Sequence, residues 1–346
     1  MKSNILSRRH FVRTSAAGTG MAALAGPAMS MGSHRNVDSS TSGAREVWIA
    51  GFSQMWLRAD SAGSMVDKVW DLLGETSSLQ PDFVCLPEVF PFEMISAKYS
   101  LAEMLEISDS VMERFAGFSR NHNCYTVCPV YVTENGQNYN SSVFFGRDGR
   151  KIGVYHKIHP TAGEIDNGIS PGPIFQAAVS TEFGPVGSQI CFDINWDDGW
   201  AMYRRQGVNI MFWPSAFDGG IMVNSKAWQH KYVVATSTNQ NNSKLCDING
   251  ATVAQTGIWN KYLYCAPVNL EKAFLHLYPY VSRFPEIQKK YGRKVRITCF
   301  HEEQWAIIES LSPDLAVVDI MAEFDLKTHE EHIDFGDKAQ KQARKS

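Results

Sequence analysis

The sequence has no surplus of positive charge and no apolar run long enough to cross a membrane. Its 33 Lys and Arg residues are matched by 36 Asp and Glu residues, a balance that argues against nucleic-acid binding. No apolar stretch reaches the roughly 20 residues that span a bilayer. The composition, 44% hydrophobic and 20% charged, excludes disordered and collagen-like architectures. We therefore expect a globular protein with no nucleic-acid partner and no membrane span.

Disulfide frameworks and nucleotide-binding loops are also missing. The seven cysteines are an odd number spread over a long chain, so they do not indicate a complete set of disulfides. Cys124 and Cys128 share one predicted strand, where they are expected to be small core side chains rather than a metal pair. Neither a GxGxxG loop nor a Walker loop occurs, so the sequence offers no visible site for a nucleotide cofactor.

Residues 1–30 are similar to a twin-arginine export signal. Arg8 and Arg9 are followed two positions later by Phe11 and then by an apolar stretch of small residues. Residues 31–44, rich in Ser and Gly, are expected to form a flexible spacer. Twin-arginine export carries folded proteins, so the signal predicts a periplasmic or secreted location. The alternative is a frayed basic terminus without a targeting role.

From Val47 onward, β-rich runs alternate with amphipathic stretches. The turn dipeptide Asp148-Gly149 predicts that 141–145 and 151–155 pair as a hairpin. Such mixed units indicate an α/β protein whose sheet is mostly buried under helices. Further strands are predicted over 47–52, 83–86, 125–132, 186–190, 208–213, 232–237, 244–248 and 251–255, and helices around 65–73, 111–118 and 200–206.

Three polar residues stand where apolar strands are predicted to end: Glu88, Lys157 and Cys191. Strand ends form the usual crevice of open α/β sheets, so these side chains can converge although they are far apart in sequence. A thiol, a carboxylate and an ammonium together suit nucleophilic attack at a carbonyl. Taken singly, each has an ordinary structural explanation, because such a cysteine is usually core and Glu and Lys are usually surface groups.

The local sequences around these residues carry a family resemblance. The blocks 86–88 (Leu-Pro-Glu), 155–160 (Tyr-His-Lys-Ile-His-Pro) and 189–193 (Gln-Ile-Cys-Phe-Asp) occur in this order. They resemble the three signature blocks of the nitrilase superfamily of carbon-nitrogen hydrolases, over roughly residues 45–270. The resemblance implies an α-β-β-α sandwich, in which two sheets are flanked by helices.

The resemblance also implies a catalytic triad of Glu88, Lys157 and Cys191. Cys191 would attack an amide carbonyl and form a thioester, with Glu88 carrying the proton, and water would then release the acid. Lys157 and the backbone N–H of Phe192 would hold the oxyanion. Glu164, seven positions after the lysine, corresponds to a second glutamate that positions the substrate and the lysine; its alternative is a surface carboxylate.

The residues after the cysteine bear on the substrate. True nitrilases of this superfamily usually carry Trp-Glu there, whereas this chain has Phe-Asp at 192–193, which resembles amidase-type branches. No arginine occurs in 194–196 to bind the carboxylate of a carbamoyl amino acid, although Arg204, Arg205 or a residue from another loop could take that role. Asp197 and Asp198 are either helix-start acids or an acidic rim that attracts a cationic amide or amine. We expect a small-molecule amide substrate.

Several aromatic and histidine residues have two interpretations. The aromatic side chains either line the substrate pocket or belong to the core: Trp196, Trp213, Phe217 and Trp228. Two histidine pairs have possible metal spacing but lack a third nearby ligand: His156 with His159, and His329 with His332. We expect no metal and no cofactor.

Residues 271–346 form a carboxy-terminal extension beyond the family core. Strands are predicted over 295–300 and 305–310 and a helix over 315–324, ahead of a polar, basic tail. An apolar pattern of this kind must pack on the core or on a partner, and the resemblance implies at least a homodimer. Rival functions are an acyltransferase that uses the same thioester, a nitrilase, and a non-catalytic binding protein.

Overall fold

The structure, a computed structural model, describes residues 46–258 and 260–345. The predicted export signal and the spacer at 31–44 lie outside the described residues. Among the helices of the described part, none is long and apolar enough to cross a membrane.

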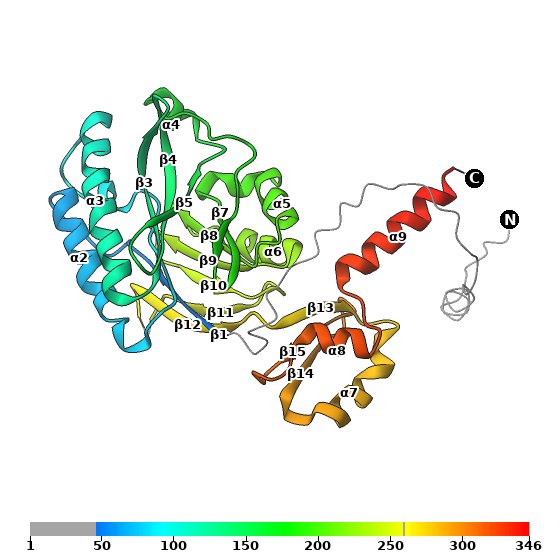
Figure 1. Ribbon diagram of the computed structural model, residues 1–346. Helices are drawn as coiled ribbons and strands as arrows, with labels where there is room; N and C mark the ends of the chain where they lie inside the picture. Colours follow the sequence, from blue (N-terminus) through cyan, green and yellow to red (C-terminus); the bar gives the residue numbers. More distant parts are fainter. Residues whose placement is uncertain (1–45, 259, 346) are drawn as a thin grey trace. The chain divides into compact units, whose positions relative to one another are not determined.

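Two six-stranded sheets lie at the centre (Figure 1), in the orders β12-β1-β2-β3-β4-β5 and β11-β10-β9-β8-β7-β6. Parallel pairs join β1 to β2 to β3 and β7 to β8 to β9, and the outer pairs are antiparallel. The first sheet consists of β1 (Glu46–Phe52), β2 (Phe83–Cys85), β3 (Tyr125–Glu134), β4 (Gln137–Phe145), β5 (Lys151–His156) and β12 (Leu263–Asn269). The second consists of β6 (Val179–Thr181), β7 (Gly184–Ser188), β8 (Ile210–Ser215), β9 (Val233–Thr238), β10 (Lys244–Cys246) and β11 (Thr252–Gln255).

Helices cover the outer face of each sheet. The α2 helix (Ala62–Gly74) and the α3 helix (Leu101–His122) begin at serine caps and bury one apolar side against the first sheet. The α5 helix (Asp198–Arg205) and the α6 helix (Ile221–His230) cover the second sheet. Figure 1 shows the resulting order of helices, sheet, sheet and helices, which confirms the predicted α-β-β-α sandwich.

Polar contacts tie the two sheets together inside the sandwich. The Ser237 hydroxyl of β9 donates to the backbone carbonyl of Cys85 in β2 at 2.7 Å. The Tyr264 hydroxyl of β12 donates to the carbonyl of Thr236 in β9 at 3.0 Å. At Gly51 a Cβ atom would lie 2.3 Å from the Tyr264 ring, so only glycine fits beside that tyrosine. These contacts hold the strand ends of the two sheets in one fixed relation.

The hairpins follow the turn dipeptides. Asn135 and Gly136 both have positive φ, 52° and 76°, the conformation that a tight β3–β4 turn needs. The predicted pairing of 141–145 with 151–155 is confirmed by the β4–β5 ladder. Sequence patterns missed α6, in which Val223 and Ala227 are the buried apolar residues and other apolar side chains lie away from that face. They also missed the short α4 helix (Ala162–Asp166).

A third sheet, in the order β13-β15-β14, follows the sandwich. The predicted strands at 295–300 and 305–310 are confirmed as β14 (Val295–Phe300) and β15 (Trp305–Ser310). Lys272 of β13 forms an ion pair with Asp247 at 2.7 Å. The remaining elements are β13 (Lys272–His276), α7 (Phe284–Tyr291), α8 (Val317–Glu323) and α9 (His329–Ala343). The basic tail expected at the carboxy terminus is therefore largely helical, because Thr328 and Glu331 form a capping box that starts α9.

Candidate active site

The candidate active site lies where three strands end. Glu88 follows β2, Lys157 follows β5 and Cys191 follows β7. The Lys157 ammonium donates to Glu88 Oε1 and to Glu164 Oε2, each at 2.8 Å. Glu88 and Lys157 are 3% and 1% exposed, and Cys191 is buried beside them, close enough for both charges to act on its thiol. The structure thus brings the four predicted residues together in a water-poor site.

The Glu88 carboxylate is held on both oxygens. Oε1 accepts hydrogen bonds from Lys157 and from the Asn140 amide of β4, and Oε2 accepts one from the backbone N–H of Ala216, all at 2.8 Å. Asn140 also donates to Glu164 Oε1 at 2.9 Å. Sequence reasoning missed Asn140, because nothing in its local pattern distinguishes it from the exposed polar residues of the same hairpin.

Replacing Asn140 with alanine is expected to lower the free energy of unfolding by about 1 to 3 kcal/mol, because the buried Glu88 carboxylate and the half-buried Glu164 carboxylate each lose a donor. The matched control is Asn138→Ala on the same strand, where the side chain only accepts a bond from Thr133 at an exposed edge. Urea denaturation of both variants measures the difference. Equal losses in the two variants would contradict the role assigned to Asn140.

Glu164 owes its position to the short α4 helix. Thr161 caps this helix by accepting a hydrogen bond from the Glu164 N–H at 3.2 Å, while the Thr161 N–H donates to Glu164 Oε2 at 2.8 Å. The same carboxylate then reaches Lys157. A capping box therefore turns a loop carboxylate into the second anion beside the lysine.

Cys191 sits on a strained turn. It has a φ of +46°, which costs a residue with a side chain on the order of 1 kcal/mol or more, and it opens a 3-10 turn over Cys191–Asn195. Asp193, fully buried, holds the turn by accepting from the Ile190 N–H at 2.8 Å. The Trp213 indole donates to the Cys191 carbonyl at 3.2 Å. These bonds present the sulfur at the end of β7.

Asp193 also links the cysteine turn to the lysine loop. Its carboxylate accepts hydrogen bonds from the Tyr155 hydroxyl at 2.7 Å and from the His159 N–H at 2.8 Å. Tyr155 and His159 lie on either side of Lys157 in the chain. A single buried carboxylate therefore fixes the lysine and the cysteine relative to each other, a role that the sequence block around the cysteine did not reveal.

The electrostatics keep the resting thiol protonated. Burial and, after it, the nearby Glu88 charge raise the pKa of the Cys191 thiol to about 12, against the opposing effect of Lys157. Burial works to lower the pKa of Lys157, but Glu88, Cys191 and Glu164 outweigh it and hold that pKa above its ordinary value. Burial likewise works to raise the pKa of Glu164, and the Lys157 charge and the Asn140 hydrogen bond outweigh it, so that pKa is lowered.

The aromatic residues near the site fall into two groups. Trp196 is 40% exposed and stacks on His159 with 4.2 Å between ring centroids, and Phe192 lies against its edge. Trp213 is fully buried behind the cysteine, where it packs on Phe217. Trp228 packs on Phe274 of β13, in the third sheet. Among these side chains, Trp196 and Phe192 are the ones exposed next to Cys191.

The two acids after Trp196 are already paired. Asp197 accepts hydrogen bonds from Lys226 at 2.9 Å and from His230 at 2.8 Å. Asp198 lies in the first turn of α5 and forms an ion pair with His159 at 3.3 Å. Both acids therefore already have partners within the described part of the protein, a lysine for Asp197 and a histidine for Asp198.

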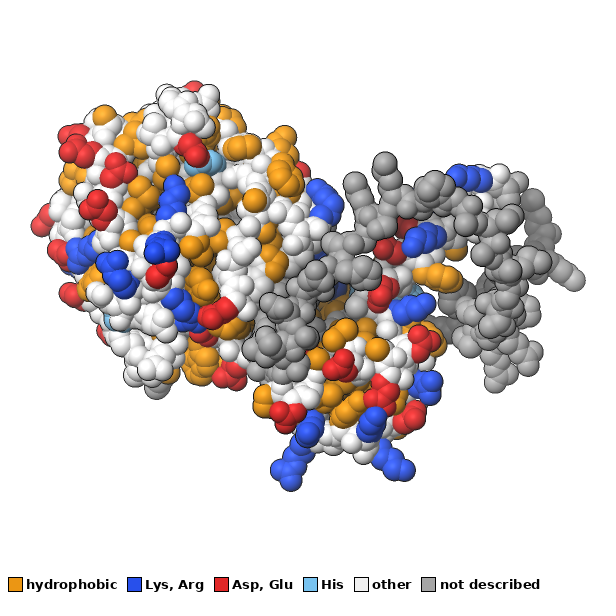
Figure 2. Space-filling model, in the orientation of Figure 1, with side chains coloured by type: hydrophobic (Ala, Val, Ile, Leu, Met, Phe, Trp, Pro, Cys, Tyr) orange, Lys and Arg blue, Asp and Glu red, His pale blue; other side chains and the backbone are white. Residues whose placement is uncertain are grey.

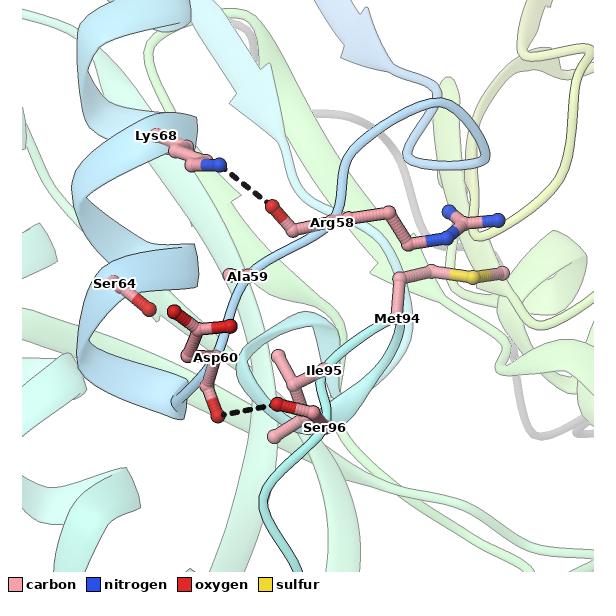
Figure 3. A pocket seen from close by; sticks show the side chains of 8 residues that line it. All are labelled: Arg58, Ala59, Asp60, Ser64, Lys68, Met94, Ile95 and Ser96. Carbon is pink, nitrogen blue, oxygen red and sulfur yellow. Dashed lines mark hydrogen bonds between the residues drawn. The ribbon is translucent and has the colours of Figure 1, made fainter.

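A separate surface hollow of about 450 Å³ lies between the start of α2 and the segment that follows Glu93 (Figure 3). There Lys68 donates to the carbonyl of Arg58 and Ser96 donates to the carbonyl of Asp60. No cysteine or histidine lines the hollow, so it lacks a nucleophile of the kind found at Cys191. Its lining residues are Arg58, Ala59, Asp60, Ser64, Lys68, Met94, Ile95 and Ser96.

Other features of the described residues concern metals, thiols and surface charge. Within 46–258 and 260–345, no three His, Cys, Asp or Glu side chains are grouped so as to hold a metal ion. All seven cysteines are free thiols. On the face seen in Figure 2, Lys and Arg side chains are interspersed with Asp and Glu side chains.

Comparison with curated proteins finds amidases among the relatives. An omega-amidase of Homo sapiens is 23% identical over 243 residues, which cover 65% of this chain and 86% of the relative. The nitrilase and fragile histidine triad fusion protein of Drosophila melanogaster is 24% identical over 172 residues, 47% of this chain and 37% of the relative. The chain spans about half or less of the length of the first curated relatives that it matches.

Solved structures share the fold at low sequence identity. An amidase from Nesterenkonia sp. superposes with a TM-score of 0.58 at 16% identity, covering 71% of this chain and 96% of that one. A mutant of that amidase carries the acetamide moiety of fluoroacetamide covalently added at its active-site cysteine, with a TM-score of 0.57 at 16% identity over 71% of this chain and 96% of the other. Residues 50–273 match the family described as carbon-nitrogen hydrolase. This match covers more than half of the sequence, and the chain therefore belongs to the carbon-nitrogen hydrolase family.

Proposed function

We propose that this protein hydrolyses a linear amide through a thioester on Cys191. The observation that carries the proposal is the buried Lys157 ammonium, which bridges Glu88 and Glu164 at 2.8 Å beside a thiol on a strained turn. Such a group of charges is costly to bury and has no packing purpose that apolar side chains would not serve better. The amidases among the relatives support the same chemistry.

In the first half of the reaction, the Cys191 sulfur attacks the amide carbonyl carbon as the thiol proton passes to Glu88. Lys157 and the backbone N–H of Phe192 stabilise the negative oxygen of the tetrahedral intermediate. The carbon-nitrogen bond then breaks, and Glu88 gives its proton to the leaving ammonia or amine. Because burial and Glu88 raise the pKa of the thiol to about 12, the resting thiol is protonated, and Glu88 has to take up its proton for the sulfur to attack.

In the second half, water replaces the amine. The water oxygen attacks the thioester carbonyl while Glu88 takes a proton from the water, and Lys157 again stabilises the developing oxyanion. The carbon-sulfur bond breaks, the sulfur takes the proton back from Glu88, and the carboxylic acid leaves. Glu164 and Asn140 hold Lys157 and Glu88 in place and take no proton.

The test is to incubate the protein with a panel of primary amides and nitriles, to measure released ammonia, and to map any adduct by mass spectrometry of the quenched protein. We expect ammonia from amides and an acyl adduct on the peptide that contains Cys191, with the six other cysteines unmodified. An adduct at Cys191 that turns over only when an amine acceptor is added would show a transferase. If no compound in the panel gives ammonia or an adduct, the proposal is overturned.

A further inference from the structure

Glu93 lies five residues after Glu88, in a loop that is firmly held. The chain turns at Val89, which has a φ of +40°, and forms a 3-10 turn over Phe90–Phe92. The buried Gln54 amide donates to the carbonyl of Phe90 at 2.8 Å and to that of Glu93 at 3.1 Å. The backbone that carries Glu93 therefore has a defined position next to the candidate active site.

The sheet register brings the same loop to the face that carries the triad. Phe92 stacks on Tyr131 of β3 with 5.8 Å between ring centroids. Tyr131 lies directly opposite Asn140 in the β3–β4 ladder, and directly opposite residues point to the same face of a sheet. Since Asn140 touches Glu88 and Glu164, the Phe92–Glu93 segment borders these two carboxylates.

The Glu93 carboxylate is half-buried and has no hydrogen bond or ion pair with the part of the chain that the structure describes. Burial raises its pKa, and the charge of Glu88 acts in the same direction. By contrast, Glu88 accepts from three donors and Glu164 accepts from Lys157, Asn140 and the Thr161 backbone. Such a carboxylate relies on water at its exposed side for hydrogen bonds, and a bound cationic group could take the place of that water.

The charges around the triad are unbalanced. Glu88 and Glu164 contribute two carboxylates to the one Lys157 ammonium that both contact, and the charge of Glu93 acts on the Glu88 carboxylate as a third negative group. An anionic substrate is repelled by this excess, whereas a cationic one is attracted. The acids after Trp196 do not supply this attraction, because Asp197 and Asp198 are already paired.

We infer that the substrate is an amide that carries an ammonium or similar cationic group, and that Glu93 binds this group while Phe92 and Tyr131 contact the chain between it and the amide. The inference rests on the proposed amide hydrolysis and adds the charge of the substrate to it. It makes Glu93 a specificity-determining residue and assigns it no step in the chemistry.

The test uses three amides of matched length and opposite charge: 4-aminobutanamide (cationic), pentanamide (neutral) and glutaramate (anionic). We expect kcat/KM to fall in that order at mildly alkaline pH, where Glu93 is ionised and the amine is charged. Glu93→Gln should lower the ratio of kcat/KM for 4-aminobutanamide to that for pentanamide by about 10-fold to 100-fold, the range of a hydrogen bond between charged groups. Glu93→Lys should invert the order in favour of glutaramate.

The charge-matched control is Glu113→Gln on the exposed side of α3, which should leave the ratio unchanged. An unchanged ratio in Glu93→Gln, with both amides still hydrolysed, would overturn the inference and leave amide hydrolysis standing. If the wild-type protein hydrolyses none of the three amides, their binding to Cys191→Ala is measured by calorimetry. If 4-aminobutanamide then binds more tightly than pentanamide, the result supports the inference about the cationic group but not the proposed hydrolysis. Equal binding of the two amides would overturn the inference.

Discussion

Cys191→Ala is expected to abolish amide turnover, lowering kcat by a factor on the order of 10⁴ or more, because no other group near the lysine and the glutamates can form the thioester. The fold should survive, since the thiol of Cys191 donates no bond on which the turn depends; the turn is held by Asp193 and Trp213. Ammonia release under substrate saturation measures kcat, and near-ultraviolet circular dichroism checks the fold.

The matched control is Cys85→Ala. Burial raises the pKa of this thiol to about 12 as well, so the two cysteines have similar acidity and differ in their neighbours. Cys85 lies in the core of the first sheet, where its loss should cost about 1 kcal/mol of stability and leave kcat within a few-fold of the parent. Removal of a nucleophile should leave far less than about one hundredth of the parent kcat. If Cys191→Ala keeps more than about one hundredth of it, the thioester route is wrong.

Lys157→Met is expected to lower the free energy of unfolding by about 3 to 5 kcal/mol at neutral pH, because it leaves the buried Glu88 carboxylate and the half-buried Glu164 carboxylate without their cation. In the variant, Glu88 and Glu164 face each other as like charges in a buried place, so a shared proton becomes favourable. Their joint pKa in the folded variant then lies above that in the unfolded chain. Stability is therefore regained as pH falls through that raised pKa, and the destabilisation should shrink in mild acid.

The parent protein should show the opposite trend in this range. The pKa of Glu164 is lowered in the folded state, so its stabilising effect is full above the ordinary glutamate pKa and is lost as pH falls through the folded value. Lys244→Met is the control, because Lys244 is also buried but donates to the neutral oxygens of Gly220 and Asn224. No ion pair of Lys244 is lost in this variant, although the Asp218 charge lies nearby, so the recovery in acid should be much smaller than in Lys157→Met. A parallel pH profile for the two lysine variants, measured by urea denaturation, would contradict the ion-pair account.

Much of the sandwich could be predicted from local patterns. Apolar runs bounded by turn residues marked nearly every strand from β1 to β11, and the spacing of Met65, Val69 and Leu73 marked α2. These features are readable because burial on one face imposes a period of two or 3.6 residues on the chain. The helices α6 and α9 lack a clear apolar face, and the sequence pattern therefore did not predict them.

The sequence by itself determined the α/β class, the family and the residue types at three strand ends, because each depends on runs of neighbouring residues. The partners of those side chains were decided by tertiary structure: Ala216 meets Glu88 across 128 positions and Asn140 meets it across 52. Such contacts depend on strand register and sheet packing, which shift side chains by whole ångströms without changing any local pattern. The unpaired carboxylate of Glu93 belongs to the same class, since a missing partner is visible only when all the neighbours are in place.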